Sequence, residues 1–188
     1  QELREIDRII GAIHLEPTAL LFAGRLHVRM GDLARAERVL SLIRTRVDSV
    51  NAWDVAARRI LEAELALARG RPADAIPLLE ASKEGAAQEG MVLGSLARAY
   101  AATGQVDAAF TTLMRLIALA PLGTESQEEW VDAHLQLARL HVAAGERERG
   151  QQWYDRYLSL RRDADPDLPE LQAVRREAAD LRGRTDRP

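Results

Sequence analysis

The chain has 188 residues, of which 47% are apolar and 29% are charged, and these values are typical of one soluble globular domain rather than a disordered segment. Because it has no cysteine, a disulfide framework and a thiolate metal site are excluded, and nothing indicates secretion, so we expect a cytoplasmic location. A net charge of −3 gives no general attraction to nucleic acid or to an anionic membrane, and no apolar run approaches the roughly 20 residues of a membrane span.

The first predicted element is a helix that ends before Pro17. A wide isoleucine face needs partners on both sides, and the sequence has no initiator methionine. We therefore favour a fragment of a longer protein over the alternative, an N-terminal capping helix. The apolar face recurs at the three- and four-residue spacing of a helix and comprises Leu3, Ile6, Ile9, Ile10 and Ile13.

Four pairs of predicted amphipathic helices follow, and a tight turn at a glycine joins the helices of each pair. The pair from Met91 to Pro121 shows the pattern most fully. Gly104 ends its first helix, since glycine takes the left-handed conformation that closes a helix without steric cost, and Pro121 stops its second helix. The first helix is predicted to bury Leu93, Leu96, Ala97, Tyr100 and Ala101, and the second Val106, Ala109, Phe110, Leu113, Leu116 and Ile117.

The four pairs agree with one another when they are aligned on their turn glycines. Small residues recur seven residues before and five residues after the glycine, where two helix backbones cross closely. A ring recurs four residues before the glycine, except in the second pair, which has Ala66 there. The glycines are Gly31, Gly70, Gly104 and Gly145, at spacings of 39, 34 and 41; the small residues are Gly24, Ala63, Ala97 and Ala138, then Ala36, Ala75, Ala109 and Gly150; the rings are His27, Tyr100 and His141.

This pattern resembles the tetratricopeptide repeat, which has a period of 34 residues in two antiparallel helices. The resemblance covers nearly the whole chain and implies an all-α fold: a right-handed α-solenoid of about four helix pairs plus a leading helix and a C-terminal capping helix, in a single domain over residues 1–182. The second pair departs most from the pattern. Glu62 and Ser82 replace large apolar residues, and Pro77 lies inside the second helix, so we expect this pair to pack irregularly.

A last helix is predicted to begin at Pro169, because proline suits the first turn of a helix. It has a single apolar face, which is typical of the helix that covers the last repeat of a solenoid and offers a polar face to water. Residues 183–188 are predicted to be a disordered tail. The apolar face comprises Leu168, Leu171, Val174, Ala178 and Leu181.

Catalytic motifs are absent from the sequence: there is no HExxH, P-loop, dinucleotide-binding glycine motif or serine elbow. His27 and His141 occupy the ring position that Tyr100 fills in the third pair, so we favour packing over acid–base or metal chemistry. His134 and His141 lie about 10.5 Å apart along one helix, too far to share a metal ion without further ligands. We therefore expect no catalytic residue, metal or cofactor within this chain, while a catalytic domain upstream stays open.

One charge pattern distinguishes the first helices. Six residues before the turn glycine stand Arg25, Glu64, Arg98 and Arg139. In tetratricopeptide arrays this part of the first helix lines the concave groove where peptides bind. We therefore predict that Arg25, Arg98 and Arg139 line this groove and hold an acidic or carboxylate-bearing segment of a partner, because guanidinium groups bind carboxylates bidentately. The alternative is an ordinary solvated face, because exposed charges constrain a sequence little.

The function implied by the resemblance is the binding of a protein or peptide. We expect this chain to bind neither nucleic acid nor a membrane. The segment DADPDLPEL resembles the end of tetratricopeptide regions that follow bacterial serine/threonine kinase or transcription-regulator domains. This implies the sensory or scaffolding region of a bacterial signalling protein. The alternative is the substrate-docking arm of an enzyme whose catalytic domain lies upstream.

Overall fold

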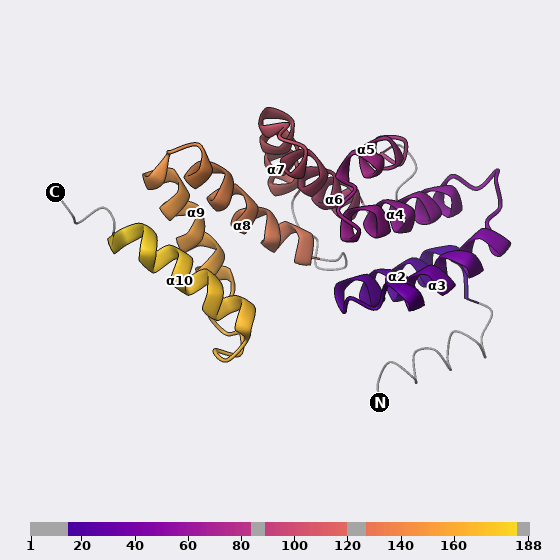
Figure 1. Cartoon of the computed structure of the whole chain (residues 1–188), viewed down its shortest axis with the longest axis horizontal. Coiled ribbons are helices and arrows are strands. Elements are labelled where there is room, and N and C mark those ends of the chain that lie inside the picture. The colour runs from indigo at the N-terminus through magenta and orange to yellow at the C-terminus, as the bar shows by residue number, and fades with distance from the viewer. Residues whose placement is uncertain (1–14, 84–88, 120–126, 184–188) are drawn as a thin grey trace. The chain divides into compact units, whose positions relative to one another are not determined.

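The computed structural model describes residues 15–83, 89–119 and 127–183, and every regular element in these ranges is a helix (Figure 1). The all-α prediction is therefore confirmed, while the predicted leading helix and residues 184–188 of the predicted tail lie outside the described residues. The helices are α2 (Pro17–Arg29), α3 (Leu33–Arg46), α4 (Ala52–Ala68), α5 (Pro72–Glu80), α6 (Glu89–Ala102), α7 (Val106–Ala118), α8 (Glu128–Ala143), α9 (Arg147–Leu160) and α10 (Pro169–Gly183).

The four predicted turns are closed by their glycines. Gly31, Gly70, Gly104 and Gly145 have φ angles of 74°, 69°, 74° and 81°, and no other described residue has a positive φ. The residue after each glycine donates its backbone N–H to the carbonyl of the residue four before the glycine, at 2.9 Å in every turn. This bond satisfies a carbonyl that the end of the first helix leaves unpaired. The second helix therefore starts within two residues of the glycine, antiparallel to the first.

The chain divides into two compact units, Gln1–Gln105 and Val106–Pro188, and the division falls between the two helices of the third pair. In the first unit, α2 packs against α3 and α4, and α4 packs against α5 and α6. The first helices of three successive pairs thus contact one another in sequence. A Cβ atom on Gly24 would lie 2.4 Å from a methyl carbon of Leu61, which explains the small residue at this crossing.

In the second unit, α8 packs against α7 and α9, and α9 packs against α10. A Cβ atom on Gly150 would lie 2.6 Å from a methyl carbon of Val142, so this small residue also serves a close crossing. As predicted, α10 covers the preceding pair: its buried residues pack against Tyr154 and Tyr157. They are Leu171, Val174, Ala178 and Leu181, whereas Leu168 is exposed, contrary to prediction, because it precedes the helix.

Two further expectations about packing need correction. Val106 and Phe110 on α7 are 49% and 38% exposed, although the sequence pattern placed them in the core. The apolar side chains of α7 spread over a wider part of its surface than neighbouring helices cover. The covered part contains Ala109, Leu113 and Leu116. Ala101 is likewise exposed at the end of α6. In the second pair, α5 contains Pro77 and has 9 residues where α3, α7 and α9 have 13 or 14, and the irregular packing of this pair stays a prediction.

Candidate functional site

The three predicted arginines lie on first helices and differ in exposure. Arg25 on α2 is buried, with 7% of its surface exposed. The side chains of Arg98 on α6 and Arg139 on α8 are 46% and 52% exposed. Arg25 and Arg98 belong to the first unit and Arg139 to the second. We call this place in each repeat, six residues before the turn glycine, the ion-pair position.

In the first unit, the buried carboxylate of Glu64 on α4 joins Arg25 and Arg98. Arg25 Nε lies 3.4 Å from Glu64 Oε1, and Arg98 Nη2 lies 2.9 and 3.0 Å from the two carboxylate oxygens. Ser95 Oγ donates a further hydrogen bond at 2.5 Å. Glu64 itself occupies the ion-pair position of the second repeat. It therefore lies 39 residues after Arg25 and 34 residues before Arg98, the same distances that separate Gly70 from Gly31 and from Gly104. One carboxylate therefore links α2, α4 and α6.

The protonation state of Glu64 follows from this arrangement. Burial by itself would raise the pKa of its carboxyl group, but the charges of Arg98 and Arg25 and the hydrogen bond from Ser95 together hold that pKa below its usual value. Glu64 is thus ionised at neutral pH.

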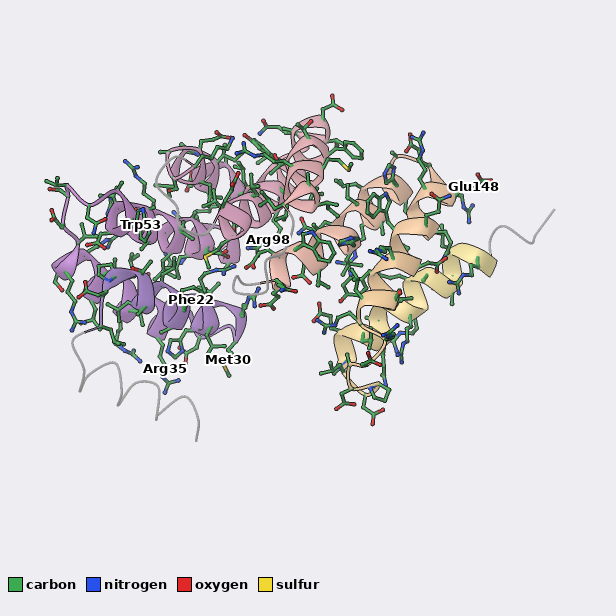
Figure 2. All side chains as sticks on the ribbon, turned by 180° about the vertical axis from the view of Figure 1, so that it is seen from behind. Phe22, Met30, Arg35, Trp53, Arg98 and Glu148 are labelled. Atoms are coloured by element: carbon green, nitrogen blue, oxygen red, sulfur yellow. The ribbon has the colours of Figure 1, made fainter. Side chains whose placement is uncertain are left out.

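Arg98, which Figure 2 labels, has donor groups that no described residue accepts from. Its bonds to Glu64 and Ser95 all come from Nη2. The Nε and Nη1 groups of Arg98 make no hydrogen bond to any described residue, and about half of the side chain is open to water. Guanidinium donors of this kind are suited to carboxylate or phosphate oxygens.

Arg139 shows in the second unit how a carboxylate binds at the ion-pair position. Its Nε and Nη2 lie 3.0 and 2.9 Å from the two carboxylate oxygens of Glu177 on α10, a bidentate pair. The hydroxyl of Tyr154 on α9 donates to the same carboxylate at 2.9 Å. Burial and the neighbouring Glu177 raise the pKa of Tyr154 to about 12, and the hydrogen bond from Arg139 lowers the pKa of Glu177. The pair fixes α10 to α8 and α9.

Sequence reasoning did not anticipate the carboxylates that these arginines hold. The signal for Glu64 was present, because it stands in the aligned position between Arg25 and Arg98. Glu177 carried no such signal, since the alignment ended with the turn at Gly145. Whether the arginines also bind a partner stays a prediction.

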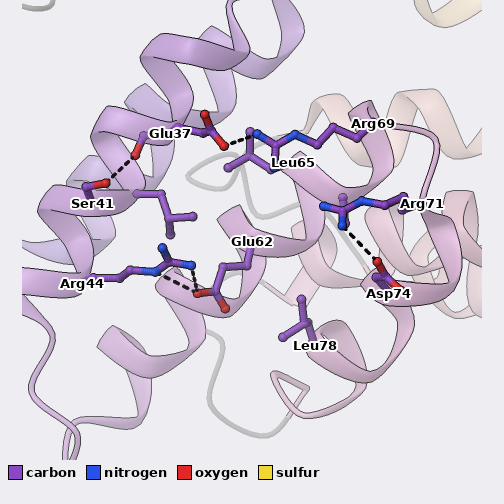
Figure 3. A pocket seen from close by; sticks show the side chains of 11 residues that line it. Glu37, Ser41, Arg44, Glu62, Leu65, Arg69, Arg71, Asp74 and Leu78 are labelled. Carbon is purple, nitrogen blue, oxygen red and sulfur yellow. Dashed lines mark hydrogen bonds and ion pairs between the residues drawn. The ribbon is translucent and has the colours of Figure 1, made fainter.

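A pocket of about 540 Å³ opens on another side of the first unit, between α3, α4 and α5 (Figure 3). Its walls carry three ion pairs, between Arg44 and Glu62, Arg69 and Glu37, and Arg71 and Asp74. Leu40, Ser41, Leu65, Ala66 and Leu78 complete the lining, and of these Leu40, Leu65 and Ala66 are buried. The accessible lining of the pocket is therefore mainly polar, with charges that are paired with one another.

An exposed apolar stripe follows α2. Phe22, Leu26 and Met30 are 45%, 41% and 56% exposed, and Figure 2 labels the first and last of them. Phe22 and Leu26 correspond in the repeat to Leu61 and Leu65 of α4, which are buried in the core of the first unit. The side chains of α2 that correspond to the buried packing face of α4 are therefore exposed among the described residues.

The histidines of the described ranges are packing residues, as predicted. His27, His134 and His141 are all less than 9% exposed, and burial lowers the pKa of His134. His134 Nδ1 lies 2.9 Å from the carbonyl oxygen of Trp130, and His141 Nδ1 lies 2.6 Å from a carboxylate oxygen of Glu146. Within residues 15–83, 89–119 and 127–183, no cluster of metal-ligating side chains is large enough to hold a metal ion. None of the helices in these ranges has the length and apolar character of a membrane span.

Comparison with known families agrees with this geometry. The family model of the tetratricopeptide repeat matches residues 17–41, 56–81, 90–113 and 131–156, which together make up more than half of the chain and coincide with the four helix pairs. The chain belongs to the tetratricopeptide repeat family. Such repeats form scaffolds for protein interaction, so the chain is a module of that kind. No curated protein matches it.

Two solved structures share the tetratricopeptide fold of this chain. Both contain nearly identical TPR-like repeats of a putative kinesin light chain from Podosopora anserina. The first, a crystal structure of a form with one substitution, is 22% identical, covers 89% of this chain and 87% of its own, and has a TM-score of 0.61. The second is 18% identical, covers 94% of this chain and 100% of its own, and has a TM-score of 0.57. The likeness extends to the fold alone.

Proposed function

We propose that this tetratricopeptide module binds acidic segments of a partner protein through Arg98 in its first unit and Arg139 in its second. The observation that carries the proposal is the state of Arg98, which is half exposed and has Nε and Nη1 without a hydrogen-bond partner among the described residues. Arg25 is buried and supports the site by holding Glu64.

The chemistry at Arg139 supports the same proposal. Its bidentate pair with Glu177 is a carboxylate held at the ion-pair position, although by the chain's own last helix. An acidic segment of a partner gains a guanidinium–carboxylate pair at Arg98, which contributes about 0–1 kcal/mol at this exposure, and at Arg139 it shares the guanidinium with Glu177.

We further propose that the module is the sensory or scaffolding region of a bacterial signalling protein in the cytoplasm. The support is the DADPDLPEL segment, which resembles the close of such regions after kinase or transcription-regulator domains. The second candidate is a substrate-docking arm of an enzyme. The full-length gene distinguishes them: a kinase or DNA-binding segment before Gln1 favours the first, and a transferase or hydrolase domain favours the second.

The test of acidic recognition compares variants in affinity capture from a lysate of the source organism, followed by elution with increasing salt. We expect the double variant Arg98→Ala, Arg139→Ala to release its partners at lower salt than the parent chain, because fewer charge pairs hold them. The double variant Arg98→Lys, Arg139→Lys keeps both charges but loses the guanidinium geometry, so we expect an intermediate result. Arg162→Ala serves as the control, since Arg162 is 78% exposed and pairs only with Asp163. Unchanged capture and elution by the double alanine variant would contradict the proposal.

A further inference from the structure

The pocket between α3, α4 and α5 lies where the second repeat departs from the pattern of the others. Ala66 stands where the other repeats have His27, Tyr100 and His141. Glu62 stands where the third and fourth repeats have leucine. Both departures line the pocket. The ring that the other repeats have at this position is therefore replaced by a methyl group within the lining of the pocket.

The ring position has a definite role in the repeats that keep it. The hydroxyl of Tyr100 on α6 donates to the carboxylate of Glu80 on α5, the second helix of the preceding repeat. The ring of His141 on α8 meets the ring of Phe110 on α7 edge to face, with the centroids 5.4 Å apart. In both cases the ring fills the space between its own helix and the preceding second helix. In the second repeat the corresponding space, between α4 and α3, is part of the pocket.

We propose that this pocket binds a tyrosine side chain of a partner protein, which supplies the ring that Ala66 lacks. The partly exposed side chain of Leu78 offers apolar contact to its ring. The guanidinium groups of Arg44, Arg69 and Arg71 lie around the same space and stack well on aromatic faces (Figure 3). A volume of about 540 Å³ falls in the range of ligand-binding pockets and leaves room for the backbone on either side of the tyrosine.

The hydroxyl group of the incoming side chain also has acceptors in the pocket. Ser41 stands ten residues after its turn glycine, as Glu80 does, and Glu80 accepts the hydroxyl of Tyr100 in the third repeat. The Ser41 hydroxyl donates to the carbonyl oxygen of Glu37 at 3.0 Å, so its own oxygen can accept. The Glu37 carboxylate also lines the pocket, where it pairs with Arg69 and is 53% exposed. Phenylalanine would cover these acceptors without pairing them, so tyrosine is the better fit.

The test is an NMR titration of the isotopically labelled chain with N-acetyl-L-tyrosinamide and, in parallel, with N-acetyl-L-phenylalaninamide. We expect the tyrosine probe to shift amide signals of residues 37–44 and 62–71 and to bind more tightly than the phenylalanine probe. Ala66→Tyr places the chain's own ring in the pocket and should weaken binding of the tyrosine probe about tenfold or more. Ala102→Tyr adds the same ring at an exposed site on α6 and should leave binding unchanged.

Several outcomes would overturn the proposal. Shifts confined to other residues, or equal binding by the parent chain and Ala66→Tyr, would show that the pocket is not the site. Equal binding of the two probes would remove the assignment of tyrosine. The variant Ser41→Ala, Glu37→Met removes both hydroxyl acceptors with little change in side-chain size, and retention of the preference for tyrosine would contradict their role. Circular dichroism and thermal melting of each variant establish that it is folded.

Discussion

The carboxylate of Glu64 is expected to be a major source of stability in the first unit, and Glu64→Gln removes its charge while keeping its shape. Removing one partner of a buried ion pair costs about 3–5 kcal/mol, because the other charge stays buried. Here Arg25 stays buried, whereas Arg98 has nearly half of its side chain in solvent and can turn to water. We therefore expect the lower end of that range, about 3 kcal/mol of unfolding free energy at neutral pH.

A matched control is Glu177→Gln in the second unit. Glu177 also holds an arginine at the ion-pair position, but its side chain is 37% exposed and that of Arg139 is 52% exposed. Ion pairs at such exposure contribute about 0–1 kcal/mol. The two variants therefore change the same chemistry and differ in burial. Urea unfolding followed by circular dichroism measures both, and equal losses of stability would refute the reasoning from burial.

The pH dependence gives a second check on Glu64. Its pKa in the folded chain lies below the usual value of 4.5. A group with a lowered pKa stabilises the fold above its unfolded pKa, and this contribution disappears as the pH falls through the folded pKa. The stability difference between the parent chain and Glu64→Gln should thus be full at pH 7 and shrink below about pH 4.5. A difference that does not change with pH would contradict the role of the charge.

Three further predictions concern the turns, the last helix and the second repeat. Gly104→Ala should lower the unfolding free energy by about 1–2 kcal/mol, because residue 104 has a positive φ that a Cβ atom disfavours. The control Gly183→Ala changes a glycine with ordinary helical geometry and open space around it, so it should not destabilise the chain. Equal melting temperatures of the two variants would contradict this prediction. Removal of residues 168–188 should expose Tyr154 and Tyr157 and cause aggregation or a lower melting temperature, and a monomeric product with unchanged melting would show that α10 does not protect them. In hydrogen exchange, residues 69–83 should open before α6, because α5 is short and contains Pro77; equal protection would count against the second repeat as the weakest.

The sequence predicted those features that depend on one residue and its local geometry. A turn glycine is recognisable because a left-handed conformation excludes most other residues, and all four were found in it. The small residues at helix crossings are similar, since Gly24 and Gly150 each stand where a Cβ atom would collide with a neighbour. Each of these requirements restricts the residue type at a single position, and that position recurs in every repeat.

Features that depend on how much of a helix its neighbouring helices cover could not be predicted from the sequence. Periodicity identified Phe110 as apolar, but its exposure is set by how much of α7 its neighbours cover. The alignment placed Arg25, Glu64 and Arg98 at one repeat position, but the distances between adjacent helices decide that they meet. Ala66 and Glu62 were visible as departures from the pattern, and only the structure places them in one pocket.

The ion-pair position also limits how this array could change its number of repeats. Its pairs in the first unit join adjacent repeats, with Glu64 between Arg25 and Arg98. Loss of the second repeat would bring two arginines together, and its duplication would place two buried glutamates side by side. Either change would place a buried charge, that of Arg25 or Glu64, beside a like charge. The order of charges in the first unit thus disfavours gain or loss of the second repeat alone.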